Sequence, residues 1–151
     1  MSVRDEIAAA IANLGLDGKQ IAEVPESQAA ALFTLFLRHF TGGLDVRWWW
    51  EHFTMPSTSV TFSDQQGFRR LCSIVPNPEE HVWFVAEDDE LASYPVYEAT
   101  PAAAQQVIGE CYGSEYYLIS KDLAWLLCEN HHDRLIAVGA VVEQRMPEGD
   151  A

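Results

Sequence analysis

Apolar residues recur at helical spacing in two segments near the start of the chain. One segment covers residues 3–14 and is followed by Gly15, and the other covers residues 26–41 and is followed by Gly42. The apolar residues of the second segment are Ala29, Leu32, Phe33, Phe36, Leu37 and Phe40. Such stripes usually face a protein core, and glycine commonly follows a helix end. We therefore predict two amphipathic helices joined by a connector at residues 16–24.

Short runs of aromatic and β-branched residues follow, and such runs are typical of strands. They cover residues 44–53, 58–62, 81–86, 94–98, 115–119, 123–129 and 135–143. Two more helices are predicted between them, one opened by a capping box at Ser63 to Gln66 and one that starts at Thr100-Pro101 and ends at Gly113. The last three strands are joined by short polar segments, which favours an antiparallel meander.

This order of elements, with helices first and strands clustered later, indicates an α+β fold. We expect one domain over residues 1–151, built as a twisted antiparallel sheet packed against helices. No apolar run is long enough to span a membrane, and the first residues lack the features of a targeting segment. The three cysteines show no CxxC spacing and lie among apolar neighbours, so they are expected to be free, buried thiols. A soluble, cytoplasmic protein is therefore expected.

Charge is distributed unevenly along the chain. Residues 76–151 contain 15 acidic and three basic residues, a net charge of −12, whereas the whole chain carries −14. Such a surface repels nucleic acid and would attract a basic protein and accelerate its association. The charge could equally serve solubility alone. We expect no nucleic-acid or membrane partner and no cofactor, and we expect a basic protein as the partner.

An acidic run and several aromatic residues are the candidates for a docking face. Residues 87–90 are predicted to form a loop, without the alternating ligands and central glycine of a calcium loop. Tyrosine and tryptophan often anchor protein interfaces, and a strand at residues 44–53 would expose at least one of its indoles. The candidate partner-binding residues are Glu87, Asp88, Asp89, Glu90, Tyr94, Tyr97 and Trp49. These aromatic residues could instead be half-buried parts of the sheet.

A second polar cluster offers an alternative, metal-assisted chemistry. Its candidate ligands are Glu129, His131, His132 and Asp133. Adjacent histidines in an extended segment point to opposite sides, which makes a shared ion difficult. A polar hairpin turn is the simpler interpretation, because Asn and Asp favour turns. The sequence contains no nucleotide-binding or serine-hydrolase motif.

The order of features resembles the SUKH superfamily, which includes bacterial immunity proteins and a yeast regulator of cell-wall glucan synthesis. In that superfamily a Leu-Pro step precedes a helix that ends in an Asn-Gly-Gly-like motif. Here the step is Val24-Pro25, the helix ends at Thr41-Gly42-Gly43, and the Asn is missing. Residues 94–139 also resemble a family of uncharacterised bacterial domains.

The SUKH resemblance implies an α+β fold that works by binding, often by neutralising a toxin nuclease or deaminase. Two functional hypotheses follow. The first is a non-catalytic protein-binding module of the immunity type that neutralises a basic toxin or effector. The second is a small metal-assisted enzyme that uses the segment from Glu129 to Asp133.

Overall fold

The computed structural model describes residues 2–43, 49–88, 94–111 and 115–148. Its helices are α1 (Val3–Leu14), α2 (Glu26–Thr41), α3 (Leu71–Ile74), α4 (Pro101–Glu110) and α5 (Ala140–Glu143), with 3-10 turns η1 (Trp49–Glu51) and η2 (Gly67–Arg70). Its strands are β1 (Ile21–Glu23), β2 (Ser57–Thr61), β3 (Val82–Ala86), β4 (Val96–Ala99), β5 (Tyr116–Ile119), β6 (Leu126–Glu129) and β7 (Arg134–Val138). The fold is α+β, as the sequence predicted.

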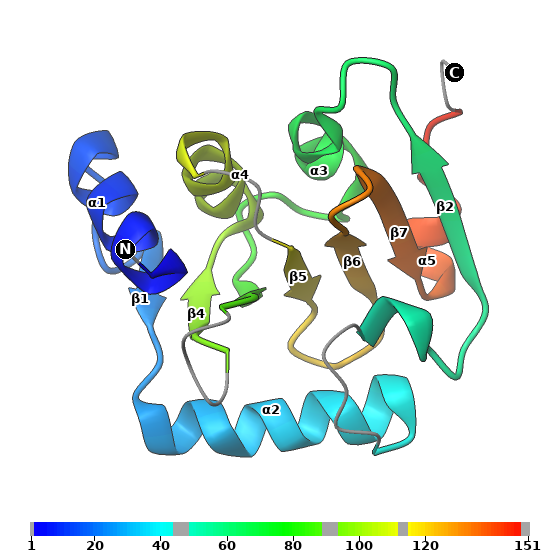
Figure 1. Ribbon diagram of the computed structural model, residues 1–151, viewed down its shortest axis with the longest axis horizontal. Coiled ribbons are helices and arrows are strands. Elements are labelled where there is room, and N and C mark those ends of the chain that lie inside the picture. Colours follow the sequence, from blue (N-terminus) through cyan, green and yellow to red (C-terminus); the bar gives the residue numbers. More distant parts are fainter. Residues whose placement is uncertain (1, 44–48, 89–93, 112–114, 149–151) are drawn as a thin grey trace.

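All seven strands form one antiparallel sheet in the order β1-β4-β3-β5-β6-β7-β2 (Figure 1). The meander predicted for the last three strands is confirmed as β5-β6-β7. The two edge strands come from the N-terminal part of the chain. β1 pairs with β4 and β2 pairs with β7, so the early segments border a sheet whose centre forms from later residues.

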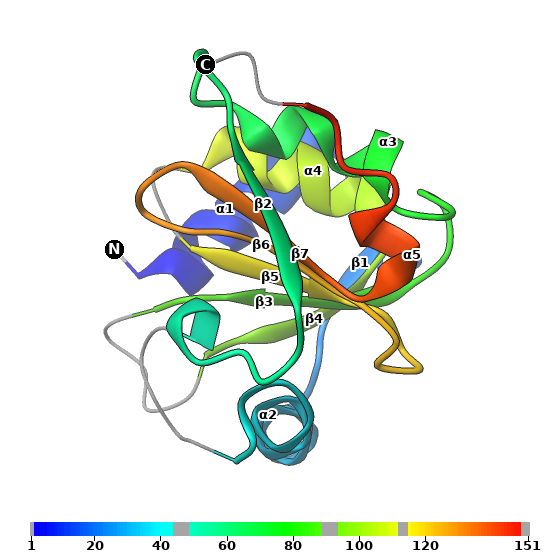
Figure 2. The same cartoon turned by 90° about the vertical axis from the view of Figure 1, so that its right-hand side faces the viewer.

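Helices cover both faces of this sheet (Figures 1 and 2). α1, α3 and α4 lie on one face, and α2 crosses the other. Side chains alternate between the two faces along each strand. In β5, Tyr116 and Leu118 join the core beneath α1 and α4, whereas Tyr117 and Ile119 join the core above α2. Because both faces are buried, β5 and β6 read as continuous apolar runs instead of alternating ones.

Three helix boundaries follow the chemistry of the sequence. The Ser2 hydroxyl accepts a hydrogen bond from the backbone N–H of Asp5, and the Asp5 carboxylate accepts one from Ser2 in return, which completes a capping box for α1. The Thr100 hydroxyl caps α4 by accepting from the N–H of Ala103. Gly42 ends α2 with a left-handed φ of 68°, a conformation that glycine adopts without strain.

The strand predicted at residues 44–53 is wrong over its described part, where residues 49–51 form the 3-10 turn η1. Residues 44–48 lie outside the described residues. The Trp49 indole is fully buried and stacks on the Tyr117 ring with a centroid distance of 4.5 Å. The turn places this single large side chain into the core above α2. The aromatic composition alone could not distinguish such a turn from a strand.

Three other boundaries differ from prediction. The capping box at Ser63 does not open a helix: helical structure starts at Gly67, after a turn in which the Asp64 carboxylate accepts from the N–H of Gln66. The connector at residues 16–24 contains β1. The last strand ends at Val138, and the chain then turns into α5.

Gly139 explains why the last strand ends early. Its φ is 103°, and a Cβ there would lie 2.4 Å from the carbonyl oxygen of Ala124. The position requires glycine and a sharp change of direction. No helix in the described ranges is long and apolar enough to cross a membrane. All three cysteines are free thiols, as predicted, but only Cys128 is buried, whereas Cys72 and Cys111 are partly exposed.

Candidate functional site

Carboxyl groups converge at one end of the central strands. Glu87 directly follows β3, Glu115 directly precedes β5, Glu129 ends β6 and Asp133 directly precedes β7. The antiparallel register pairs Ala86 with Tyr116, Tyr116 with Glu129 and Glu129 with Leu135, so all four acidic residues lie at the same end of the sheet. We call these residues, together with Asp88, the acidic end.

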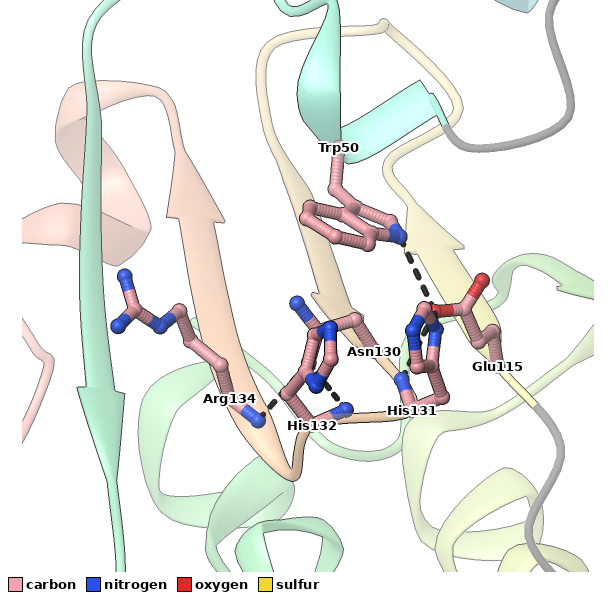
Figure 3. Close-up of polar contacts among 6 residues, drawn as sticks. All are labelled: Trp50, Glu115, Asn130, His131, His132 and Arg134. Atoms are coloured by element: carbon pink, nitrogen blue, oxygen red, sulfur yellow. Dashed lines mark hydrogen bonds and ion pairs between the residues drawn. The ribbon is translucent and has the colours of Figure 1, made fainter.

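Glu115 makes several hydrogen bonds within the acidic end (Figure 3). Its Oε2 accepts hydrogen bonds from the Trp50 indole Nε1 at 3.0 Å and from the backbone N–H of His131 at 2.8 Å. His131 Nδ1 also lies 2.8 Å from this oxygen. Glu115 is only 4% exposed, whereas the side chain of His131 is 40% exposed. The buried carboxylate therefore holds both an indole and an imidazole in fixed orientations.

The charge of Glu115 is maintained despite its burial. Burial raises the pKa of Glu115, but hydrogen bonds from the Glu87 side chain and from His131 lower it further than burial raises it, so the net pKa lies below its usual value. The contacts with Glu87 and His131 therefore keep the buried Glu115 carboxylate ionised.

The segment between β6 and β7 is the polar hairpin turn that the sequence favoured. The Asn130 carboxamide oxygen accepts from the backbone N–H groups of His132 and Arg134, and Asp133 has a left-handed φ of 59°. In this turn the rings of His131 and His132 lie against each other, with centroids 4.0 Å apart. The expectation that they point to opposite sides is wrong because the segment is not extended. The Arg134 guanidinium points toward β2 (Figure 3).

Glu129 lies on the opposite face of the sheet from Glu115. Its Oε1 accepts a hydrogen bond from the Tyr116 hydroxyl at 3.0 Å, and the backbone N–H of Gly67 also donates to the carboxylate. A Cβ at Gly67 would lie 2.8 Å from Glu129 Oε2, so glycine allows this close approach. Burial raises the pKa of Glu129 above its usual value, and the charge of Asp133 raises it further.

A cavity of about 210 Å³ opens beside Glu129. It lies between the strand ends, α1, η2 and the C-terminal end of α4. Its lining is part apolar and part polar. The apolar lining includes Val3, Ile7, Phe68, Phe84 and Ile108, and the polar lining includes Tyr116, Glu129, Asn130, His131 and Asp133. Cys111 also lines it, and burial raises the pKa of this thiol to about 11, which keeps it protonated and unreactive at neutral pH.

Three of the predicted docking residues are buried in the structure. Trp49 and Tyr97 are buried, at 0% and 2% exposure, and Asp88 is also buried at 2%. Trp49 and Tyr97 pack into the two cores, and the Asp88 carboxylate accepts a hydrogen bond from the Arg4 backbone N–H at the start of α1, so these side chains present little surface to a partner.

Among the remaining docking candidates, Tyr94 is half-buried in an edge-on contact with the Phe33 ring, and Glu87 is 9% exposed. Side chains this far inside the molecule offer a partner little contact area. Asp89 and Glu90 lie outside the described residues. The alternative interpretation, in which the aromatic residues belong to the sheet and its cores, fits the described positions better.

The four candidate metal ligands do not converge. Glu129 turns toward Tyr116 and Gly67, whereas His131 turns toward Glu115 on the other face of the sheet. The His132 ring packs against Trp50. Within the described parts of the chain, no three His, Cys, Asp or Glu side chains are grouped so that they could hold a metal ion. This arrangement gives the metal-assisted hypothesis no support.

Sequence reasoning missed the parts of the site that depend on strand register. Glu115 is not among the candidate site residues identified from the sequence, although its carboxylate accepts hydrogen bonds from Trp50 and His131. Tyr116 and Trp50 gave no separate signal, since aromatic residues are common in strands. The available signal was that several strands each have an acidic residue at one end. These residues can be recognised as a cluster only when the strand register is known.

These features define an α+β protein whose antiparallel sheet is covered on both faces and ends in a group of carboxyl residues, most of them buried, beside a small cavity. The chain belongs to a family of unknown function, DUF6756, whose family model matches residues 1–149. Searches of curated proteins and of solved structures found no significant match to this chain.

Proposed function

We propose that this chain is a non-catalytic protein-binding module that binds a basic protein through its acidic end. The observation that carries the proposal is the convergence of Glu87, Asp88, Glu115, Glu129 and Asp133 at one end of the sheet. A concentration of negative charge in a site of low dielectric produces a stronger field than the same charges spread through solvent. A basic partner is the macromolecule that such a field attracts.

Accessible groups beside the acidic end can supply the direct contacts. Glu51 is exposed and directly follows Trp50, which bonds to Glu115. Glu110 is exposed at the end of α4, next to the cavity-lining Gly109. Exposed carboxylates at the rim steer a partner and set its orientation, whereas the buried ones maintain the field.

The resemblance to the SUKH superfamily supports an immunity-type role, in which the module neutralises a basic toxin or effector in the cytoplasm. The three free thiols agree with a reducing compartment. On this proposal the Glu115–His131 pair orients the hairpin turn and takes no part in a reaction.

An affinity pull-down from lysate of the source organism, run at low and at high salt, tests the proposal. We expect one basic protein to be recovered near stoichiometry at low salt and to be released as salt screens the charges. Recovery of no such protein, or binding that salt leaves unchanged, would contradict the proposal.

A pair of double variants locates the docking face. Glu51→Lys with Glu110→Lys reverses exposed charge beside the acidic end, and we expect at least tenfold slower association with the captured protein. Glu79→Lys with Glu80→Lys makes the same change of net charge before the start of β3, at the opposite end of the sheet, and serves as the matched control. Equal slowing in both double variants would mean that net charge acts without a defined docking face.

A further inference from the structure

Glu129 is a buried carboxylate that lacks a cationic partner. It is 9% exposed, and its hydrogen bonds come from the Tyr116 hydroxyl and the Gly67 backbone N–H, both of which are neutral. No Lys, Arg or His in the described ranges forms an ion pair with it. Arg70, whose charge lowers the pKa of Glu129, forms an ion pair with the Asp64 carboxylate at 2.9 Å.

A buried charge without an opposite charge is costly, and proteins usually pair it or neutralise it with a proton. Asp133 increases the cost at Glu129, because it adds a second negative charge nearby. The cavity offers a third way to relieve the cost, since it opens directly onto Glu129 and has room for a ligand group.

The apolar part of the cavity lining indicates what the rest of that ligand group should be. Phe68, Ile108 and Ile7 contribute apolar surface to the same cavity as the carboxylates. Lysine and arginine combine an alkyl stem with a terminal cation, and they bury the stem along apolar surface when the charged end meets a partner. An amphipathic lining of this kind therefore fits an alkyl chain that ends in an ammonium or guanidinium group.

We propose that the cavity is a socket for one lysine or arginine side chain of the basic partner, with the alkyl stem against Phe68 and Ile108 and the cation at Glu129 and Asp133. This inference rests on the proposed protein-binding function and names the element of the partner that the acidic end recognises. The raised pKa of Glu129 adds a requirement: the cation displaces the proton, so binding tightens as pH rises and releases a proton.

The first test uses Nα-acetyl-lysine methylamide and Nα-acetyl-arginine methylamide, titrated into the full chain labelled with ¹⁵N. We expect shifts at the amides of Gly67 and Gly109, with a dissociation constant on the order of 1 mM. Gly18, which has open space around it and lies far from the cavity lining, provides a reference amide. Nα-acetyl-norleucine methylamide has the stem without the charge and should bind at least tenfold more weakly.

Two variants connect these shifts to the carboxylate. Glu129→Gln keeps the side-chain shape and an oxygen that can accept from the Tyr116 hydroxyl, but it removes the charge. It should weaken the binding of both cationic probes at least tenfold. Glu79→Gln removes one exposed carboxylate before β3 and should leave the affinities of both probes unchanged. Equal binding of norleucine and lysine probes, or equal binding to wild type and Glu129→Gln, would overturn the cation assignment.

The captured protein provides the second test and separates the two proposals. Capture that is at least tenfold weaker with Glu129→Gln, together with probe binding, supports the socket. Capture without any probe binding keeps the protein-binding function and removes the socket. Probe binding with unchanged capture by Glu129→Gln would show that the cavity takes a free amine instead of a partner side chain, which also overturns the docking assignment.

Discussion

The Trp50 indole donates a hydrogen bond to the Glu115 carboxylate across 3.0 Å, and this bond connects η1 to the start of β5. The two residues are 65 positions apart in the sequence. The same carboxylate oxygen accepts from the backbone N–H of His131 in the hairpin turn. One buried acid thus joins three segments that the sheet alone would leave separate.

The variant Glu115→Gln should reduce stability in a way that depends on pH. Hydrogen bonds to an ionised group contribute about 1.5–3 kcal/mol each, so we expect a loss of about 2–3 kcal/mol at pH 7. The folded-state pKa of Glu115 is lowered, so its contribution is fully present above the ordinary value of 4.5 and disappears as pH falls through the folded value. Urea unfolding at pH 7 and pH 3 measures the difference, which should shrink at the lower pH. A difference that is constant with pH would contradict this role.

The variant Glu129→Gln should show the opposite dependence. The folded-state pKa of Glu129 is raised, so ionisation above the ordinary value of 4.5 destabilises the folded state. Wild type therefore loses stability as pH rises through the folded value, whereas the glutamine variant does not. We expect the variant to gain stability relative to wild type between pH 4 and pH 8, as measured by thermal unfolding. A relative loss over that range would mean that an unseen cation already compensates the carboxylate.

The variant Gly139→Ala should be strongly destabilising. Its Cβ would lie 2.4 Å from the Ala124 carbonyl oxygen, and its φ of 103° is unfavourable for any residue with a side chain. Backbone movement and strain together should cost about 2–4 kcal/mol of unfolding free energy. Gly18→Ala is the matched control, because nothing lies within 4 Å of a Cβ there, and it should change stability by less than about 0.5 kcal/mol. Equal effects would show that the close approach is not maintained.

The three thiols should differ in reactivity toward a thiol-specific reagent such as DTNB. Cys128 is buried and should react only when the protein unfolds. Cys111 is partly accessible, but burial raises its pKa to about 11, so its rate should increase about tenfold per pH unit between pH 7 and pH 10. Mass spectrometry of the labelled protein identifies each site. Fast labelling of Cys128 in the native protein would contradict the packing of β6.

The sequence allowed prediction of the elements whose signals are local. The stripe from Ala29 to Phe40, the cap at Thr100 and the turn at Asn130 to Asp133 each depend on neighbours within a few residues, and all three were predicted. The fold class followed from the order of these elements. Errors occurred where a distant contact decides the conformation. Trp49 turns inward because Tyr117 lies above it, and the chain bends at Gly139 because the Ala124 backbone is adjacent.

The candidate site was predictable only in part for the same reason. Glu129, His131 and Asp133 attracted attention as a cluster in the sequence, and they do line one cavity. Their partners, Glu115 and Tyr116, come from a different part of the chain. The strand register brings them close, and composition does not reveal the register. Tyr94 and Tyr97 were predicted to contact a partner, but the sheet is covered on both faces, so that Tyr97 is buried and Tyr94 is half-buried.

The position of the two edge strands has a consequence for synthesis on the ribosome. β1 and β2 leave the ribosome early, but their pairing partners β4 and β7 end only at residues 99 and 138. β2 must therefore wait, with unpaired backbone groups, until β7 has emerged. The sheet should be completed only after that point, and polypeptides truncated before β7 should be prone to aggregation, because exposed strand segments and apolar surface promote association.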